Sequence, residues 1–209
     1  YLLTQKILQW FLYDEPKENL VKHYGDYFRK VNFEIKPLLI KIFTEEFAKN
    51  DTAGSKIKNP LEYILLLTSE LKTQRPESTT IAFFLKQQGM DLFNPPNVKG
   101  WDGGKSWLTS QIYLQRNNVA DLLSSGKSIP RSKLERENTL NKKQAFSISL
   151  DWNTKGTNKE IIKELTDRLL FSTDTSLHQD LEKILKYDFD PQSLGANDAV
   201  LRLFNAIIK

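Results

Sequence analysis

Hydrophobic residues recur every three or four positions along most of the chain, and this is the spacing of amphipathic α-helices. The period is present in residues 2–13, after Pro16, after Asn32 and in later segments up to residue 207. No apolar run is long enough to span a bilayer. The pattern predicts an all-α fold, an irregular bundle of about eight or nine helices.

Several helix ends are marked by the residues that stand there. Asn59-Pro60 is typical of a helix start, with asparagine as the N-cap and proline in the first turn. Thr157 and Glu160 have the spacing of a capping box. Gly89 and Gly126 follow apolar periods and are expected to end helices.

Residues 94–107 interrupt the helical pattern with the sequence NPPNVKGWDGGKSW. They hold two of the eight prolines, three of the nine glycines and two of the four tryptophans. Proline ends the preceding helix because it fixes φ and lacks a backbone donor, whereas glycine permits tight turns. Since large aromatic side chains favour burial, we predict a long ordered loop that Trp101 and Trp107 fix to the helices.

Two further roles for this loop stay open. Residues 103–106 (GGKS) are predicted to begin the next helix, and backbone amides at a helix start bind anions such as sulfate, phosphate or a carboxylate. Alternatively, an exposed tryptophan stacks on a sugar or a peptide. Asp102 is expected to bond to its own backbone, or to cap those amides itself. The predicted ligand-binding residues are Trp101, Asp102, Gly103, Gly104, Lys105, Ser106, Trp107 and Arg116.

A change of composition divides the chain after the loop. Residues 124–145 are polar and charged, and apolar residues then alternate with polar ones over residues 146–152. The alternation predicts either a strand or an extended segment that packs on the bundle. We therefore predict a helical domain over 1–123, a linker with a short extended segment over 124–157, and C-terminal helices over 158–209 on the same core.

Composition limits the chemistry. The net charge of +4 is dispersed, so we do not expect nucleic acid binding. The absence of cysteine excludes disulfides and thiolate sites. His23 and His178 lie apart without metal-ligand spacing, and no cofactor or metal site is predicted. Neighbouring carboxylates, such as Glu45-Glu46, point apart on a helix and do not predict a shared proton.

Several segments resemble one bacterial family, the domain of unknown function 1800, in its C-terminal half. They are residues 10–16 (WFLYDEP), 58–63 (KNPLEY), 89–101 (GMDLFNPPNVKGW) and 116–120 (RNNVA). The resemblance covers about residues 5–120 and is faint beyond 124. Its most specific part is PPNVKGW, whereas Met90-Asp91 stands where the family pattern has Gln-Pro.

The resemblance implies a largely helical protein that is exported to the periplasm or cell surface, and it carries no known activity. We expect a non-catalytic binding or scaffolding module with a protein or carbohydrate partner. The alternative is a hydrolase or other enzyme whose catalytic groups lie partly in a missing N-terminal half. A deep polar pocket beside Trp101 favours the enzyme, and a shallow exposed aromatic patch favours binding.

Overall fold

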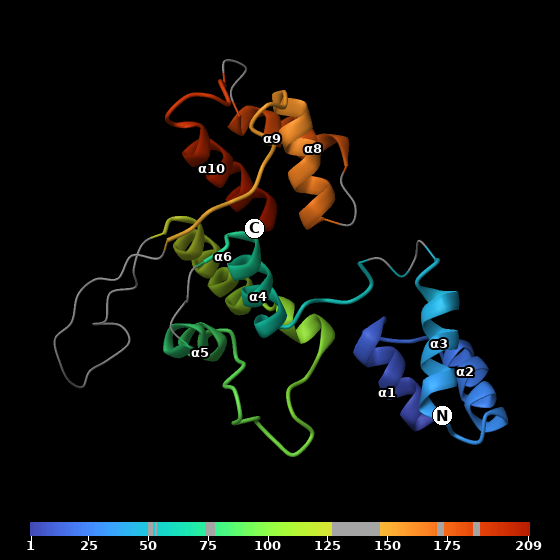
Figure 1. Cartoon of the computed structure of the whole chain (residues 1–209). Helices are drawn as coiled ribbons and strands as arrows, with labels where there is room; N and C mark the ends of the chain where they lie inside the picture. Colours follow the sequence, from blue (N-terminus) through green and yellow to red (C-terminus); the bar gives the residue numbers. More distant parts are fainter. Residues whose placement is uncertain (50–51, 53, 74–77, 127–146, 171–173, 186–188) are drawn as a thin grey trace. The chain divides into compact units, whose positions relative to one another are not determined.

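The computed structural model describes residues 1–49, 52, 54–73, 78–126, 147–170, 174–185 and 189–209. Over these residues the chain forms nine α-helices and no strand, which confirms the all-α prediction (Figure 1). The chain divides into two compact units. Unit 1 comprises Tyr1–Lys58 and Gly103–Ser106, and unit 2 comprises Asn59–Asp102 and Trp107–Lys209.

Unit 1 is built from the helices α1 (Leu2–Phe11), α2 (Glu18–Lys30) and α3 (Ile35–Glu46). Each helix turns one apolar stripe inward, and the spacing of the buried residues is three or four. Its core consists of Leu8, Leu12, Val21, Tyr24, Phe28, Leu38 and Ile42. The three helices are therefore held together by a single apolar cluster.

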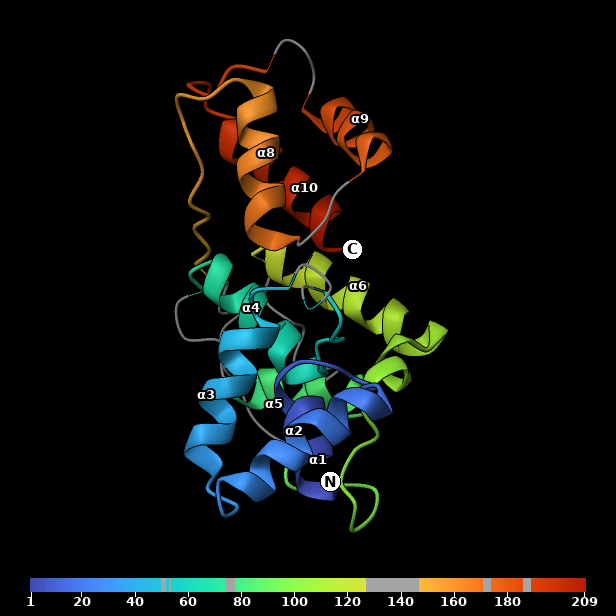
Figure 2. The ribbon, with the colours of Figure 1, turned by 90° about the vertical axis from the view of Figure 1, so that its right-hand side faces the viewer.

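Unit 2 contains α4 (Pro60–Glu70), α5 (Ser78–Gln87), α6 (Ser110–Ser124), α8 (Asn158–Leu169), α9 (Thr175–Ile184) and α10 (Ala196–Ile208). One buried cluster joins α4, α5 and α6, and another joins α8, α9 and α10. The last three helices lie together in both views (Figures 1 and 2). Because α10 places Phe204 in the first cluster and Leu203 in the second, it links the two parts of this unit.

The helix ends predicted from single residues are confirmed. Asn59 and Thr157 each accept a hydrogen bond from the backbone of a glutamate three residues on, and each glutamate bonds back to the cap. Side-chain caps of this kind stabilise a helix by about 1 kcal/mol. Gly89 and Gly126 follow their helices with φ of +82° and +62°, which glycine adopts without strain.

The prediction that an α-helix begins at residues 103–106 (GGKS) is wrong. Gly104–Leu108 forms a short 3-10 helix, η2, and the α-helix α6 begins only at Ser110. Gly104 has a φ of +61°, which is outside the right-handed helical region. The N-cap is Thr109, whose side chain accepts a hydrogen bond from the backbone N–H of Ile112.

The alternating segment forms no strand over its described residues, 147–152. Ser149 donates one backbone hydrogen bond of 2.9 Å to the carbonyl of Leu71, while Ile148 and Leu150 pack against the first cluster of unit 2. The segment is therefore the extended segment packed on the helices, the second of the two predicted forms, because one backbone hydrogen bond cannot build a sheet. Phe146 and residues 127–145 of the predicted linker lie outside the described residues, and the predicted domain boundaries stay predictions.

Candidate functional site

The first half of the Pro/Gly/Trp loop, residues 94–107, stands in solvent. Phe93, immediately before it, is 97% exposed, and Val98 and both prolines are also exposed. Phe93 has a φ of +64°, a conformation that a bulky residue rarely adopts. Such strained residues concentrate at functional sites, where the surrounding structure holds them. The exposed pair Phe93 and Val98 is therefore the first candidate for a contact surface.

Local hydrogen bonds give this exposed segment a defined shape. At its base, Asn94 donates to the backbone carbonyl and to the carboxylate of Asp91, over 3.0 and 3.3 Å. At its far end, Lys99 N–H donates to Asn97 Oδ1 over 2.8 Å. Lys86 of α5 also pairs with Asp91, and its hydrogen bond holds the pKa of that carboxyl below the ordinary value. The departure from the family pattern at Asp91 thus supplies a polar anchor for the loop.

The second half of the loop differs from the first. Trp107 is 6% exposed, which confirms that this side chain is buried, whereas Trp101 is only partly buried. Burial of a large aromatic ring stabilises the local structure by several kcal/mol. Trp107 is therefore the stronger of the two predicted anchors.

The predicted ligand-binding residues belong to both compact units. Gly103, Gly104, Lys105 and Ser106 lie in unit 1. Trp101, Asp102, Trp107 and Arg116 lie in unit 2.

Within unit 1, Asp14 lies directly against the GGKS turn. A Cβ placed on Gly104 would lie 3.2 Å from Asp14 Cγ, so no larger residue fits there without a shift. The carboxylate of Asp14 also accepts a hydrogen bond of 3.0 Å from the backbone N–H of Ile57. The sequence analysis did not predict this contact. No local pattern indicates it, because residues 14 and 104 are distant along the chain.

The position of Asp14 bears on the predicted anion site. An anion at the amides of η2 would lie near this carboxylate, and like charges repel. η2 is also a 3-10 helix of five residues, so few aligned peptide dipoles contribute. The anion site stays a prediction, and Asp14 is the group that opposes it.

Arg116 has a place in the core of unit 2. Its side chain is buried, and the guanidinium carbon lies 4.9 Å from the centroid of the Tyr63 ring. Burial lowers the pKa of Arg116, although a guanidinium stays charged in proteins. Burial also raises the pKa of the Tyr63 hydroxyl to about 12, so it too keeps its proton at neutral pH. This stacking indicates a structural role for the arginine.

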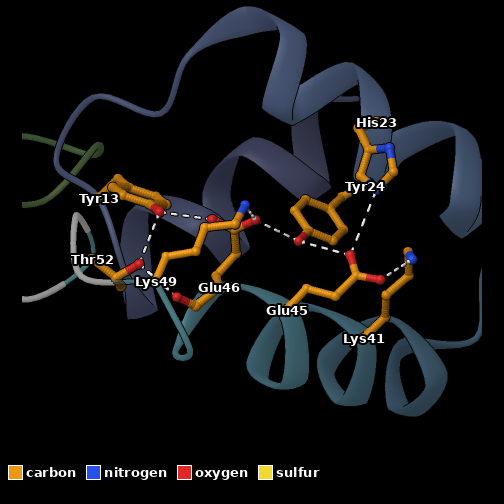
Figure 3. A network of polar contacts seen from close by, with 8 residues as sticks. All are labelled: Tyr13, His23, Tyr24, Lys41, Glu45, Glu46, Lys49 and Thr52. Atoms are coloured by element: carbon orange, nitrogen blue, oxygen red, sulfur yellow. Dashed lines mark hydrogen bonds and ion pairs between the residues drawn. The ribbon is translucent and has the colours of Figure 1, made fainter.

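A second polar cluster lies in unit 1 and was not predicted (Figure 3). The hydroxyl of Tyr24 lies 2.6 Å from Glu46 Oε1 and 3.1 Å from Glu45 Oε2. The two adjacent glutamates therefore meet at one tyrosine hydroxyl, a contact that the sequence did not predict. Tyr24 comes from α2 and lies between the two side chains, which are long enough to reach the same atom.

Glu46 is the centre of this cluster. It is 1% exposed and also accepts hydrogen bonds from Tyr13 over 2.7 Å and from Lys49 over 2.6 Å. Burial by itself raises the pKa of Glu46, but the hydrogen bonds from Lys49 and the two tyrosines outweigh it, so the pKa lies below the ordinary value. Burial and the same carboxylate raise the pKa of Tyr24. Because both oxygens of Glu46 are occupied, the cluster indicates a structural role.

Comparison with known proteins identifies the family of this all-helical chain. The chain belongs to the family described as Protein of unknown function (DUF1800), whose model matches residues 1–207. The match continues well beyond residue 124, where the resemblance in the sequence had become faint. No curated protein and no solved structure matches the chain.

Two further findings concern the described residues alone. No group of three or more potential ligands among them could hold a metal ion. None of their helices combines the length and the apolar character needed to cross a membrane.

Proposed function

We propose that this chain is a non-catalytic binding or scaffolding module of an exported bacterial protein. The observation that carries the proposal is the exposed pair Phe93 and Val98 on a loop shaped by its own hydrogen bonds. Burying one such side chain against a partner contributes about 1.5–3 kcal/mol. A shaped loop also loses little conformational entropy when it binds.

The chemistry of the loop favours a protein partner. Phe93, Pro95, Pro96 and Val98 present apolar groups of different shapes rather than one flat ring. Apolar and aromatic groups of this kind act as anchors in protein interfaces. A carbohydrate partner would instead use a stacking ring, and Trp101 is partly buried. The alternative, an enzyme completed by groups from elsewhere in a longer protein, has no supporting observation among the described residues.

Site-specific crosslinking in the bacterium tests the proposal. A photoreactive phenylalanine analogue at position 93 should yield a discrete crosslinked protein. The same analogue at Leu194 is the matched control, because that side chain is also fully exposed. Val98→Asp should abolish the crosslink without changing the thermal melt, since the side chain has no contacts to lose. Fractionation of the same cells should place the protein in the periplasm or at the cell surface.

Three results would contradict the proposal. The first is equal crosslinking at positions 93 and 194, which would indicate random encounters. The second is a loss of crosslinking that occurs only together with unfolding. The third is a protein that fractionates wholly with the cytoplasm. This result would refute export, and the crosslinking results alone would then test the binding role.

A further inference from the structure

Helix α1 carries apolar residues on more than its buried side. Leu8 and Leu12 point into the core of unit 1. Leu3, Trp10 and Phe11 instead remain exposed, with Trp10 at 70%. Residues 3, 10 and 11 share one side of a helix because their spacings are seven and eight. A surface helix that needed only its core stripe would have polar residues at these positions.

Helix α3 continues the same surface. Ile40 and Phe47 are exposed, Phe47 at 61%, and Phe43 lies between them in the helical spacing. The rings of Phe11 and Phe43 meet edge to face with centroids 5.2 Å apart, and Phe43 and Phe47 are 5.3 Å apart. These contacts join the two helices into one surface. We name it the α1/α3 apolar face and define it as Leu3, Trp10, Phe11, Ile40, Phe43 and Phe47.

Exposed lysines lie on both helices of this face. They are Lys6 of α1 and Lys36 of α3, whereas the two acidic residues of α3, Glu45 and Glu46, bond to Tyr24 of α2. The ammonium of Lys56 lies 5.5 Å from the centroid of the Trp10 ring and donates a hydrogen bond to the Trp10 carbonyl. The apolar face is thus accompanied by cations. A partner with acidic groups beside its apolar surface would be complementary.

We propose that the α1/α3 apolar face binds an amphipathic helix of a partner protein, with apolar residues at helical spacing and acidic residues beside them. The rings of Phe11 and Phe43 meet between the two helices and give the apolar side of a third helix a continuous surface to pack against. A second copy of this chain is disfavoured, because two faces accompanied by lysines repel each other. The proposal concerns unit 1 and does not depend on the role of Phe93 and Val98.

Titration of the full chain with two model peptides tests this proposal. One peptide has leucine at positions i, i+3, i+4 and i+7 and glutamate elsewhere, and the other has lysine in place of glutamate. In calorimetry at low salt the glutamate peptide should bind roughly tenfold more tightly than the lysine peptide. The preference should shrink as salt is added, because exposed charges are screened. Equal affinities, or no binding of the glutamate peptide, would overturn the proposal.

Variants locate the binding surface and separate its two components. Ile40→Ser with Phe47→Ser should weaken the glutamate peptide by roughly tenfold or more. Lys6→Glu with Lys36→Glu should reverse the peptide preference while keeping the apolar surface. Leu194→Ser is the control, because it removes a fully exposed apolar side chain from unit 2. If the serine variants lose their fold, the Lys6→Glu and Lys36→Glu variant still tests the binding surface, because both lysines are exposed and their replacement should leave the fold intact.

Other occupants of the face predict different results. Anionic phosphatidylglycerol vesicles that bind more tightly than the glutamate peptide would assign the face to a membrane surface. Dimerisation in sedimentation that Phe47→Ser abolishes would assign it to a second copy. Either result would refute the proposed helix partner. Neither bears on crosslinking at position 93, so this proposal and the proposed function can fail separately.

Discussion

Replacing Glu46 by glutamine tests whether a buried carboxylate holds the three helices of unit 1 together. Each of its oxygens accepts a hydrogen bond from one tyrosine, Tyr24 at Oε1 and Tyr13 at Oε2. Glutamine keeps one acceptor oxygen and presents an NH2 group to the other tyrosine. One hydrogen bond to a charged group contributes about 1.5–3 kcal/mol. The ion pair with Lys49 contributes at most about 1 kcal/mol, because the lysine side chain is half exposed.

The expected loss in the free energy of unfolding of unit 1 is therefore roughly 2–4 kcal/mol. Hydrogen exchange measured on peptides from α2 and α3 during urea titration reports this unit separately from unit 2. Glu45→Gln is the matched control. Glu45 is exposed, and Tyr24 is the one hydrogen-bond partner that it has in common with Glu46. That variant should lose less than about 1 kcal/mol. A Glu46→Gln protein within about 0.5 kcal/mol of the wild type would refute the structural role.

The pH dependence of stability gives an independent measure of the same carboxylate. The pKa of Glu46 is lower in the folded protein than the ordinary value of about 4.3 for an unfolded chain. The stabilisation is therefore fully present above the unfolded pKa and is lost as pH falls through the folded pKa. Glu46→Gln should flatten the acid limb of the stability curve of unit 1. An acid limb as steep as in the wild type would assign the pH dependence to other carboxyl groups.

Three further predictions concern the loop. Trp107→Ala should lower the free energy of unfolding of unit 2 by about 3–5 kcal/mol in a denaturant titration. Trp101→Ala should lower it by less, because Trp107 is buried and Trp101 only partly so. A larger effect at Trp101 would contradict this prediction. Gly104→Val should destabilise unit 1 by about 1–3 kcal/mol, because φ is +61° and Asp14 fills the space. Gly100 has a φ of +90° but open space around it, so Gly100→Ala should lower the free energy of unfolding by less in the same titration. Phosphate should shift the amide resonances of η2 more strongly in Asp14→Asn than in the wild type, and unchanged resonances in both would exclude the anion site.

The helical pattern was legible in the sequence because each helix satisfies its backbone internally and needs only one apolar stripe to meet a core. Capping residues act over three positions, so Asn59, Thr157 and the terminating glycines could be assigned correctly without knowledge of the fold. The GGKS turn was assigned wrongly, since its sequence does not indicate whether a glycine starts an α-helix or takes a left-handed turn. Gly104 takes the turn, and Asp14 lies beside it.

What the sequence by itself determined is therefore local: the all-α class, most helix positions, and a loop where the pattern stops. The tertiary structure decided which distant groups meet. It brought Tyr24 between Glu45 and Glu46, and it joined Phe11 to Phe43 across two helices. It also buried Trp107 more deeply than Trp101, although the sequence had predicted both as anchors of the loop. Hydrophobic spacing fixes which side of a helix is apolar, but the partner of that side is set by packing between segments far apart in the chain.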